Sequence, residues 1–300
     1  MRKAFAIIEL SIALIISFVV VLSIINGSNA IYKKIQTIGS NPKGNTEEAV
    51  NILPATISNL RLWLDAQNVN SFAEEERSYG SSISKWQGLN PADPSQVQAD
   101  FTQSNQSYKP LYAENGINNL PSLFFDGVND YLKSYNPDND IYSTNDGITI
   151  FIVVEPHSTT NDSKFVFDFG FVGNTGYGIY MNGLETFCYS PLNYGGVAVR
   201  QLYDSFEKGT IASCNIKFQD KISLYVDGQL IDSSSISLSK ITSDEITEYY
   251  NMTVGYVAKG GNSTRFFQGY IGEIIIYDRS LTPSEQQSVE QYLSQKWGIN

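Results

Sequence analysis

Residues 269–299, GYIGEIIIYDRSLTPSEQQSVEQYLSQKWGI, combine the two patterns on which the fold prediction depends. The first part is rich in β-branched and aromatic side chains, which predicts a strand. The sequence TPSE from Thr282 to Glu285 is a capping box with proline at the first helical position, so a helix should begin there. One stripe of this helix carries side chains at helical spacing: Val289, Tyr292, Leu293 and Trp297. We expect a short C-terminal helix that packs this stripe against a β-sandwich.

Upstream, many short runs of strand-forming residues are separated by Gly, Asn, Asp and Pro. They are LRLWLDA, SLFFDG, ITIFIVVE, KFVFDFG, YGIYM, TIASCNIK, KISLYVDG and MTVGYVA. Such runs at short spacing predict an all-β, antiparallel jelly-roll sandwich. Residues 148–154, ITIFIVV, are apolar on both faces and should be central, whereas apolar and polar residues alternate from Ile222 to Asp227, so that strand should have one face in water. We expect these side chains in the core: Phe124, Ile150, Ile152, Leu224, Ile274 and Ile276.

The N-terminus differs from the rest of the chain. A basic start is followed by an apolar run from Phe5 to Ile25 that contains one ionisable side chain, Glu9. Placing an acidic side chain in the hydrocarbon core of a membrane costs roughly 2.5–3.5 kcal/mol. We therefore expect Glu9 to have a functional role. We expect a transmembrane helix over residues 5–39, a small, polar, proline-containing linker over 40–56, and a folded domain over 57–300 outside the cytoplasm.

This N-terminus resembles the prepilin signal of type IV pilins and type II secretion pseudopilins. The resemblance implies a leader over residues 1–4, cleavage after Ala4 by a prepilin peptidase, methylation of the new N-terminus at Phe5, and assembly with other pilin-like subunits through Glu9. Members of these families usually have Gly where this chain has Ala4. Two alternatives are cleavage by signal peptidase after Ala30 and an uncleaved anchor. The resemblance places the protein in a bacterial inner membrane, with a periplasmic or cell-surface domain.

Other segments resemble the laminin-G-like, concanavalin-A-like jelly-roll domains of bacterial surface and secreted proteins. They are LWLDA, KPLYAENGINNLPSLFFDGVNDYL, LYVDGQLI and the C-terminal stretch quoted above, in that order. The resemblance covers residues 58–300. It implies two curved antiparallel sheets and a glycan or protein ligand, but it does not imply one activity.

The charge balance and the acidic residues exclude several function classes. With 31 Asp and Glu against 20 Lys and Arg, the net charge of −11 argues against nucleic acid as a partner. Glycanases on this fold place alternating carboxylates on one strand, and the chain has no such string. The acid-rich segments Glu74–Glu76 and Asp244–Glu248 indicate solvated surface, and His157 has no nucleophile motif near it. We therefore predict no catalytic residue and no enzyme.

The two cysteines and one glycine turn are the remaining candidate sites. Cys188 and Cys214 lie in separate strand-like segments and would form a disulfide in an oxidising compartment if the strands are neighbours, or else be buried thiols. Asp126, Asn129 and Asp130 offer oxygen ligands of the kind calcium prefers. We favour a β-turn in which these side chains bind their own backbone, so no cofactor is predicted and calcium is the alternative.

These patterns favour a membrane-anchored or pilus-associated protein whose jelly-roll head binds a glycan or surface protein, in adhesion or secretion. Tyrosines such as Tyr189, Tyr194 and Tyr203 could stack on sugar rings, although aromatic residues of a sandwich are more often in the core. Two alternatives are an envelope glycan hydrolase with a diverged active site, which two facing acids in a groove would support, and a purely structural pseudopilin without a groove.

Overall fold

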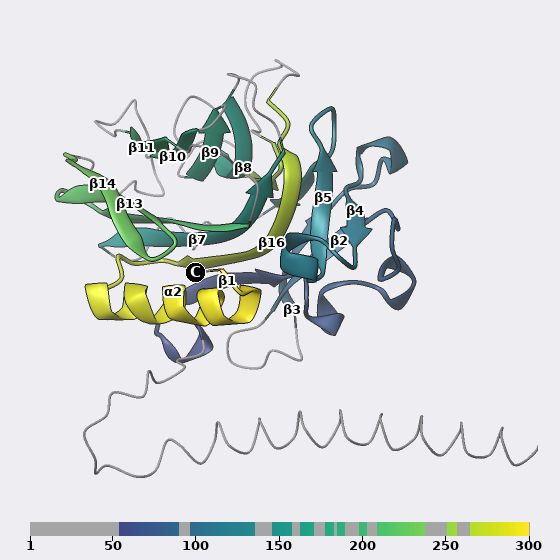
Figure 1. Cartoon of the computed structure of the whole chain (residues 1–300), viewed down its shortest axis with the longest axis horizontal. Helices are drawn as coiled ribbons and strands as arrows, with labels where there is room; N and C mark the ends of the chain where they lie inside the picture. Colours follow the sequence, from purple (N-terminus) through teal and green to yellow (C-terminus); the bar gives the residue numbers. More distant parts are fainter. Residues whose placement is uncertain are drawn as a thin grey trace, which may run out of the picture. The chain divides into compact units, whose positions relative to one another are not determined.

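Two antiparallel sheets packed face to face make up the folded domain. The computed structural model describes residues 54–89, 97–135, 146–157, 163–170, 178–182, 185–189, 198–202, 209–237, 251–256 and 265–299. Within these residues each sheet has eight strands, and the chain changes sheet repeatedly, after β1, β3, β5, β6, β7, β11, β14 and β15. Figure 1 shows the two layers. The predicted antiparallel sandwich is confirmed.

The bounds of the elements are as follows. Sheet A runs in the order β14 (Gln229–Ser235), β13 (Lys221–Val226), β12 (Thr210–Lys217), β7 (Gly147–Pro156), β16 (Gln268–Tyr277), β5 (Ser122–Asp126) and β4 (Leu111–Ala113), and β1 (Leu60–Asp65) also pairs with β16. Sheet B runs in the order β11 (Ala198–Leu202), β10 (Glu185–Tyr189), β9 (Gly178–Asn182), β8 (Ser163–Gly170), β15 (Asn251–Val254), β6 (Leu132–Tyr135), β3 (Val97–Thr102) and β2 (Lys85–Leu89). The helical elements are η1 (Pro54–Thr56), η2 (Val69–Ser71), η3 (Glu74–Glu76), η4 (Gln106–Tyr108), η5 (Ile117–Asn119) and α2 (Pro283–Trp297).

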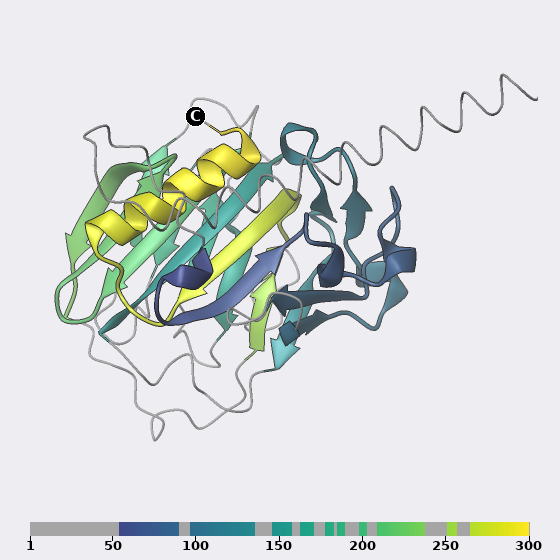
Figure 2. The same ribbon diagram turned by 90° about the horizontal axis from the view of Figure 1, so that it is seen from below.

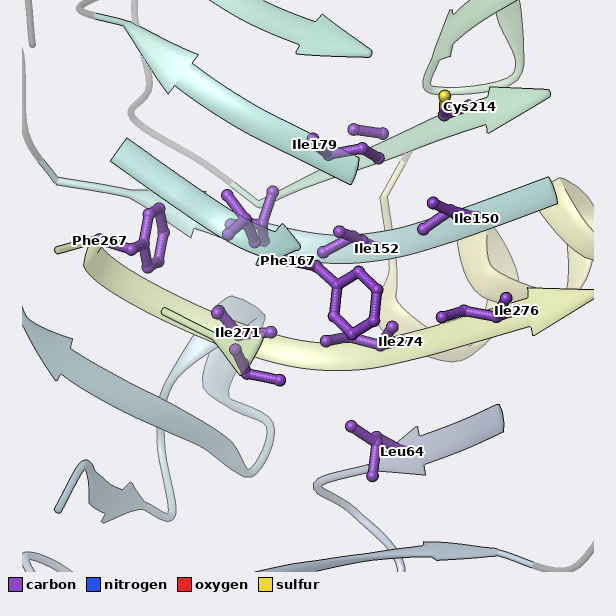
Figure 3. Packing of buried hydrophobic residues seen from close by; sticks show 14 of the residues in the cluster. Leu64, Ile150, Ile152, Phe167, Ile179, Cys214, Phe267, Ile271, Ile274 and Ile276 are labelled. Atoms are coloured by element: carbon purple, nitrogen blue, oxygen red, sulfur yellow. The ribbon is translucent and has the colours of Figure 1, made fainter. Parts of the chain in front are cut away.

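The main core fills the space between the sheets. Strand β7 contributes Ile150 and Ile152 to this core, while Phe151 and Val153 point to the opposite face of sheet A and pack under α2. The prediction that 148–154 form a central strand, apolar on both faces, is therefore confirmed. Figure 3 shows Ile150 and Ile152 beside Ile274 and Ile276 of β16.

Helix α2 covers the outer face of sheet A, which is the face turned away from sheet B (Figures 1 and 2). The predicted capping box is present, because the Thr282 hydroxyl accepts from the Glu285 N–H and the Glu285 carboxylate accepts from the Thr282 N–H. The apolar stripe of the helix packs on β1, β7 and β16. At Gly272, a bulge in β16 leaves room for the Trp297 ring, since a Cβ there would lie 2.4 Å from it.

Two packing predictions were wrong. Phe124 is only half-buried, because its neighbours Leu123 and Phe125 point into the core and Phe124 points to the outer face of sheet A. The polar face predicted for β13 is in water only at its end, where Asp227 is exposed. Ser223 is buried and Tyr225 half-buried, since α2 lies over that face and places Glu290 near Tyr225. A helix far along the chain therefore covers a strand whose own pattern predicts exposure.

The predictions for the N-terminus lie outside the described residues. These are the leader 1–4, the helix 5–39, and the residues Ala4, Phe5, Glu9 and Ala30. Among the helices that the structure does describe, none combines the length and the apolar character that crossing a membrane requires. The contacts of the folded domain begin within the range 40–56, because the Pro54 carbonyl accepts a hydrogen bond of 2.9 Å from the Tyr277 hydroxyl.

Candidate functional site

The outer face of sheet B, turned away from sheet A, is the sheet surface left open by the described helices. The helix α2 lies on the other side of the sandwich, against sheet A (Figure 1). The strands of sheet B still carry large aromatic side chains on this outer face. Such side chains normally need a cover or a ligand, so this face is the candidate site.

Three aromatic rings lie side by side on neighbouring strands of this face, and we call them the ring triad. They are Phe165 of β8, Tyr180 of β9 and Tyr189 of β10. Phe165 lies 5.2 Å from Tyr180 and 5.8 Å from Tyr189 between ring centroids, and the two tyrosines are 5.6 Å apart. The tyrosines point outward because strand alternation sends their neighbours Ile179 and Cys188 into the core.

A buried carboxylate fixes one ring of the triad. Asp168, Gly178 and Tyr189 lie in line across β8, β9 and β10, and the Tyr189 hydroxyl donates to Asp168 Oδ1. The missing side chain at Gly178 makes this reach possible, since a Cβ there would lie 2.8 Å from the Tyr189 hydroxyl oxygen and 2.3 Å from the Phe167 carbonyl oxygen. The hydrogen bond holds the Tyr189 ring flat across the neighbouring strand.

A second aromatic group, which we call the tyrosine stack, continues across sheet B beyond β8. Its members are Tyr108, Tyr131, Tyr256 and Phe266. Tyr256 stacks on Phe266 at 4.6 Å and lies 5.5 Å from Tyr131, which is 6.1 Å from Tyr108. Phe266 and Phe165 form a β-bridge, so the stack and the ring triad are neighbours.

Charged side chains surround the rings. Arg200 pairs with Glu185 at 3.1 Å, at the edge of the face nearest β11. Burial and then the negative charge of Glu185 raise the pKa of Tyr180, with Arg265 acting in the opposite direction, so the hydroxyl stays protonated at neutral pH. The face thus presents flat apolar rings beside hydroxyl, carboxylate and guanidinium groups, a mixture suited to the apolar faces and hydroxyls of sugars.

At the glycine turn, the acidic side chains accept hydrogen bonds from the backbone of the turn itself. Asp126 Oδ1 accepts from the N–H groups of Val128 and Asn129 at 2.8 and 3.1 Å, and Asp130 Oδ2 accepts from the Asp126 N–H at 3.0 Å. This is the turn interpretation we favoured. Burial, reinforced by the Asp126 charge, raises the pKa of Asp130 to about 7. The Asn129 side-chain oxygen is buried without a partner, and the described residues contain no metal-binding group of three or more His, Cys, Asp or Glu.

The two cysteines are joined by a disulfide with a Cα–Cα distance of 5.5 Å. The predicted disulfide is confirmed, and because β10 belongs to sheet B and β12 to sheet A, the bond crosses the core between the sheets. Both cysteines are completely buried, and Figure 3 shows Cys214 beside the apolar core.

The other sequence candidates are dispersed. His157 is exposed on the sheet A side, with Nε2 3.1 Å from Glu155 and its ring beside Tyr270. Glu74–Glu76 form the surface turn η3. Tyr194, Tyr203 and Asp244–Glu248 lie outside the described residues. Of the tyrosines named from the sequence, the structure places Tyr189 in the site.

Sequence reasoning missed Phe165, Asp168, Tyr180 and Arg265. Two signals were present in the segments KFVFDFG and YGIYM. The first places an acid inside an apolar strand, and the second has a glycine at the start of a strand. Neither signal shows which strands are neighbours, so the pairing of Asp168 with Tyr189 across Gly178 was not visible.

Comparisons with known proteins agree with this architecture. A family model described as the concanavalin A-like lectin/glucanases superfamily matches residues 126–285. No curated protein sequence matches the chain. Trypanosoma rangeli sialidase in complex with sialic acid aligns with a TM-score of 0.57 and 14% identity, over 93% of this chain and 40% of that one. Domain 4 of an extracellular arabinanase from Geobacillus stearothermophilus, in complex with arabinotriose, aligns with a TM-score of 0.50 and 15% identity, over 78% of this chain and 98% of that one.

A third similar structure is the binding domain of botulinum neurotoxin serotype D/C, with a TM-score of 0.47 and 12% identity, over 70% of this chain and 52% of that one. The chain thus spans about half of the length of the neurotoxin binding domain and less than half of the length of the sialidase. At these identities the similarity supports the fold alone.

Proposed function

The chain belongs to the concanavalin A-like lectin/glucanases superfamily, and we propose that its domain is a glycan-binding module that holds its ligand on the outer face of sheet B. The observation that carries this proposal is the ring triad with its buried carboxylate, Asp168, bonded to the hydroxyl of Tyr189. That arrangement keeps an aromatic surface in one orientation before any ligand arrives, which lowers the entropy cost of binding.

Sugars fit such a surface for a physical reason. One face of a pyranose ring presents C–H groups that pack on an aromatic ring, while its hydroxyls need hydrogen-bond partners at the edge. Tyr180 and Tyr189 supply half-buried rings, and Glu185 and Arg200 supply polar groups beside them. Binding by one domain is expected to be weak, and many domains on one surface would strengthen it through multivalency.

We propose that the domain binds its ligand without turnover. Glycoside hydrolysis needs two carboxylates on either side of the scissile bond. On this face Asp168 is buried and bonded to Tyr189, and Glu185 pairs with Arg200. Both acids therefore already have structural contacts, which favours the binding role over the hydrolase alternative.

We also propose a place for the protein in the cell. The basic start, the apolar run from Phe5 and the intramembrane acid Glu9 support a pilin-like segment that anchors the domain at a bacterial inner membrane, on its outer side. In that setting the domain would act in adhesion or as part of a secretion assembly. Mass spectrometry of the mature N-terminus tests this proposal, which requires methylated Phe5.

The test of glycan binding uses the full-length protein in detergent micelles on an array of polysaccharides. We expect saturable binding to at least one glycan, and Tyr180→Ala should weaken it about tenfold because a stacking ring is lost. The matched control is Tyr79→Ala, which removes an exposed tyrosine elsewhere and should leave affinity unchanged. Absence of binding to all glycans, or equal losses in both variants, contradicts the proposal. Release of free sugars that Asp168→Asn abolishes would support the hydrolase instead.

A further inference from the structure

Arg265 lies where the ring triad meets the tyrosine stack. Its guanidinium carbon is 6.0 Å from the centroid of the Phe165 ring, in a cation–π contact. The Arg265 carbonyl accepts from the Phe165 N–H at 3.4 Å, and the next residue, Phe266, stacks on Tyr256. The backbone and the ring contact thus place this side chain among the aromatic residues of both groups.

The aromatic residues around Arg265 follow the strand order of sheet B. Tyr189, Tyr180 and Phe165 lie on β10, β9 and β8, and the tyrosine stack continues past β15 to the start of β6. Neighbouring strands are about 4.8 Å apart, so the rings form a band perpendicular to the strands. A band of this length fits several consecutive sugars of a linear chain better than a single sugar, and Arg265 lies in its middle.

The charge of Arg265 has no ion-pair partner in the part of the chain that the structure describes. Its side chain is exposed, and among the described residues no carboxylate forms an ion pair with it. Two other cations of the same face are paired, Arg200 with Glu185 at 3.1 Å and Lys85 with Asp100 at 2.9 Å. Lys133 of β6 is exposed and likewise forms no ion pair with a described residue.

Arg265 combines this unpaired charge with an aromatic contact, in a chain whose net charge is −11. A guanidinium is planar and presents paired N–H donors that match the two oxygens of a carboxylate. Its contact with the Phe165 ring limits its motion, which reduces the entropy lost when a ligand binds.

We propose that the glycan bound on this face is acidic, and that Arg265 binds a carboxylate of one of its sugars while neighbouring sugars stack on the partly exposed tyrosines of the ring triad and the tyrosine stack, whose Phe165 and Phe266 are buried beneath them. Lys133 adds positive charge toward one side of the band. This inference rests on the proposed glycan-binding function and narrows its ligand to chains that contain uronic or similar carboxylated sugars.

The test compares an acidic glycan with its own methyl ester, which keeps the sugar rings and removes the negative charge. The full-length protein in detergent micelles is first screened on an array that contains neutral, uronic-acid and sialic-acid glycans. For the acidic glycan that binds best, we expect the ester to bind about tenfold or more weakly at 0.15 M salt. Arg265→Gln should weaken binding of the acid by a similar factor and leave binding of the ester unchanged.

Two further variants separate a specific contact from general charge. Lys85→Gln removes one positive charge from the same face but takes it from a lysine paired with Asp100, so its effect should be less than about twofold because exposed charges are screened. Arg265→Lys should restore only part of the affinity, since an ammonium lacks the planar fork. Because Arg265 is exposed, all these variants should melt at the wild-type temperature.

The outcomes distinguish this inference from the proposed function. Equal affinity for acid and ester, or equal losses in Arg265→Gln and Lys85→Gln, overturns the acidic ligand. If neutral glycans bind best and Tyr180→Ala weakens them, the glycan-binding function stands and only the acidic ligand is wrong. If no glycan of any class binds, both are overturned.

Discussion

The two outer faces of the sandwich resemble each other in composition and differ in what covers them. Each has aromatic rings beside a buried acid. On sheet A, Glu273 accepts hydrogen bonds of 2.7 Å from the indole N–H groups of Trp63 and Trp297, and α2 closes over the cluster. On sheet B, Asp168 accepts from Tyr189, and the rings of Tyr180 and Tyr189 stay partly exposed.

This comparison separates a structural use of aromatic residues from a binding use. Under α2, Lys296 contacts both Glu273 and Asp65, so each of these two acids has a cationic partner within the chain. On sheet B, Arg265 has no such partner among the described residues. Charged side chains that are paired within the chain are typical of a packed interface. An exposed charged side chain without such a partner is what the proposed ligand-binding surface requires.

The largest expected effect comes from the cluster under α2. Lys296→Met leaves the carboxylates of Glu273 and Asp65 buried without their cation, which should lower the free energy of unfolding by about 3–5 kcal/mol. Although burial alone would lower the pKa of Lys296, these two acids raise it above its usual value, so the side chain is charged. Chemical denaturation measures the loss, and glycan affinity of the folded protein should not change.

The control for that variant is Lys217→Met, which removes a lysine from an exposed ion pair with Asp220. Surface pairs of this kind contribute less than about 1 kcal/mol. A similar small loss for Lys296→Met, or a fall in glycan affinity without unfolding, would mean that the two faces do not have separate roles.

A smaller effect depends on pH and concerns Glu290 of α2. Ser213 and Gln286 donate to its Oε1, whereas Oε2 is buried without a partner. Burial raises the pKa of Glu290 from 4.5 to about 7, with the Asp227 charge acting in the same direction. The folded protein therefore keeps a proton that the unfolded chain releases. This stabilisation is complete below about pH 4.5 and is lost as the pH rises to about 7.

Glu290→Gln removes the titration, so relative to wild type it should gain stability between pH 5 and 8, reaching about 1–3 kcal/mol. Asp130, whose pKa is also raised to about 7, titrates in both proteins and cancels in the difference. Glu285→Gln should change the pH dependence of stability in the opposite direction. Hydrogen bonds from Arg279 lower the pKa of Glu285 to about 2, so that stabilisation is present at neutral pH and lost in acid. A constant difference between wild type and Glu290→Gln across this pH range would contradict the prediction.

The smallest expected effect is on sheet B. Tyr189→Phe keeps the ring and removes the hydroxyl that donates to Asp168, which should cost about 1 kcal/mol of stability. Glycan affinity should fall severalfold, because the ring is no longer held across Gly178. Tyr79→Phe, at an exposed position, serves as the control. Unchanged stability and affinity in Tyr189→Phe would show that the hydrogen bond does not position the ring.

The sequence patterns predicted elements better than they predicted neighbours. The capping box at Thr282, the central position of β7 and the burial of Ile152 and Ile274 follow from local patterns, and all are confirmed. The alternation of apolar and polar residues in β13 predicts that Ser223 is exposed to water. That alternation carries no information about α2, which lies much later in the sequence and covers this face. Phe124 lies in an uninterrupted apolar run, which does not show which residues point inward.

The candidate site was harder to predict for the same reason. Tyr189 was named from its chemistry alone, but its partner Asp168 lies two strands away, and the register that aligns them depends on a bulge in the pairing of β8 with β9. Pairing across strands is decided by tertiary packing, which a single sequence does not display.

The disulfide between β10 and β12 has a mechanical consequence. If the domain is tethered through its N-terminus while a ligand grips sheet B, tension enters at β1, which pairs with β16 of sheet A, and leaves through the opposite sheet. The noncovalent contacts between sheet A and sheet B are those of the apolar core, and these contacts break when force is applied. The bond from Cys188 to Cys214 joins the two sheets covalently, and Cys188 lies on β10 directly before Tyr189. In an oxidised domain, pulling on a bound ligand would therefore load a covalent link between the sheets before it could shear the sandwich open.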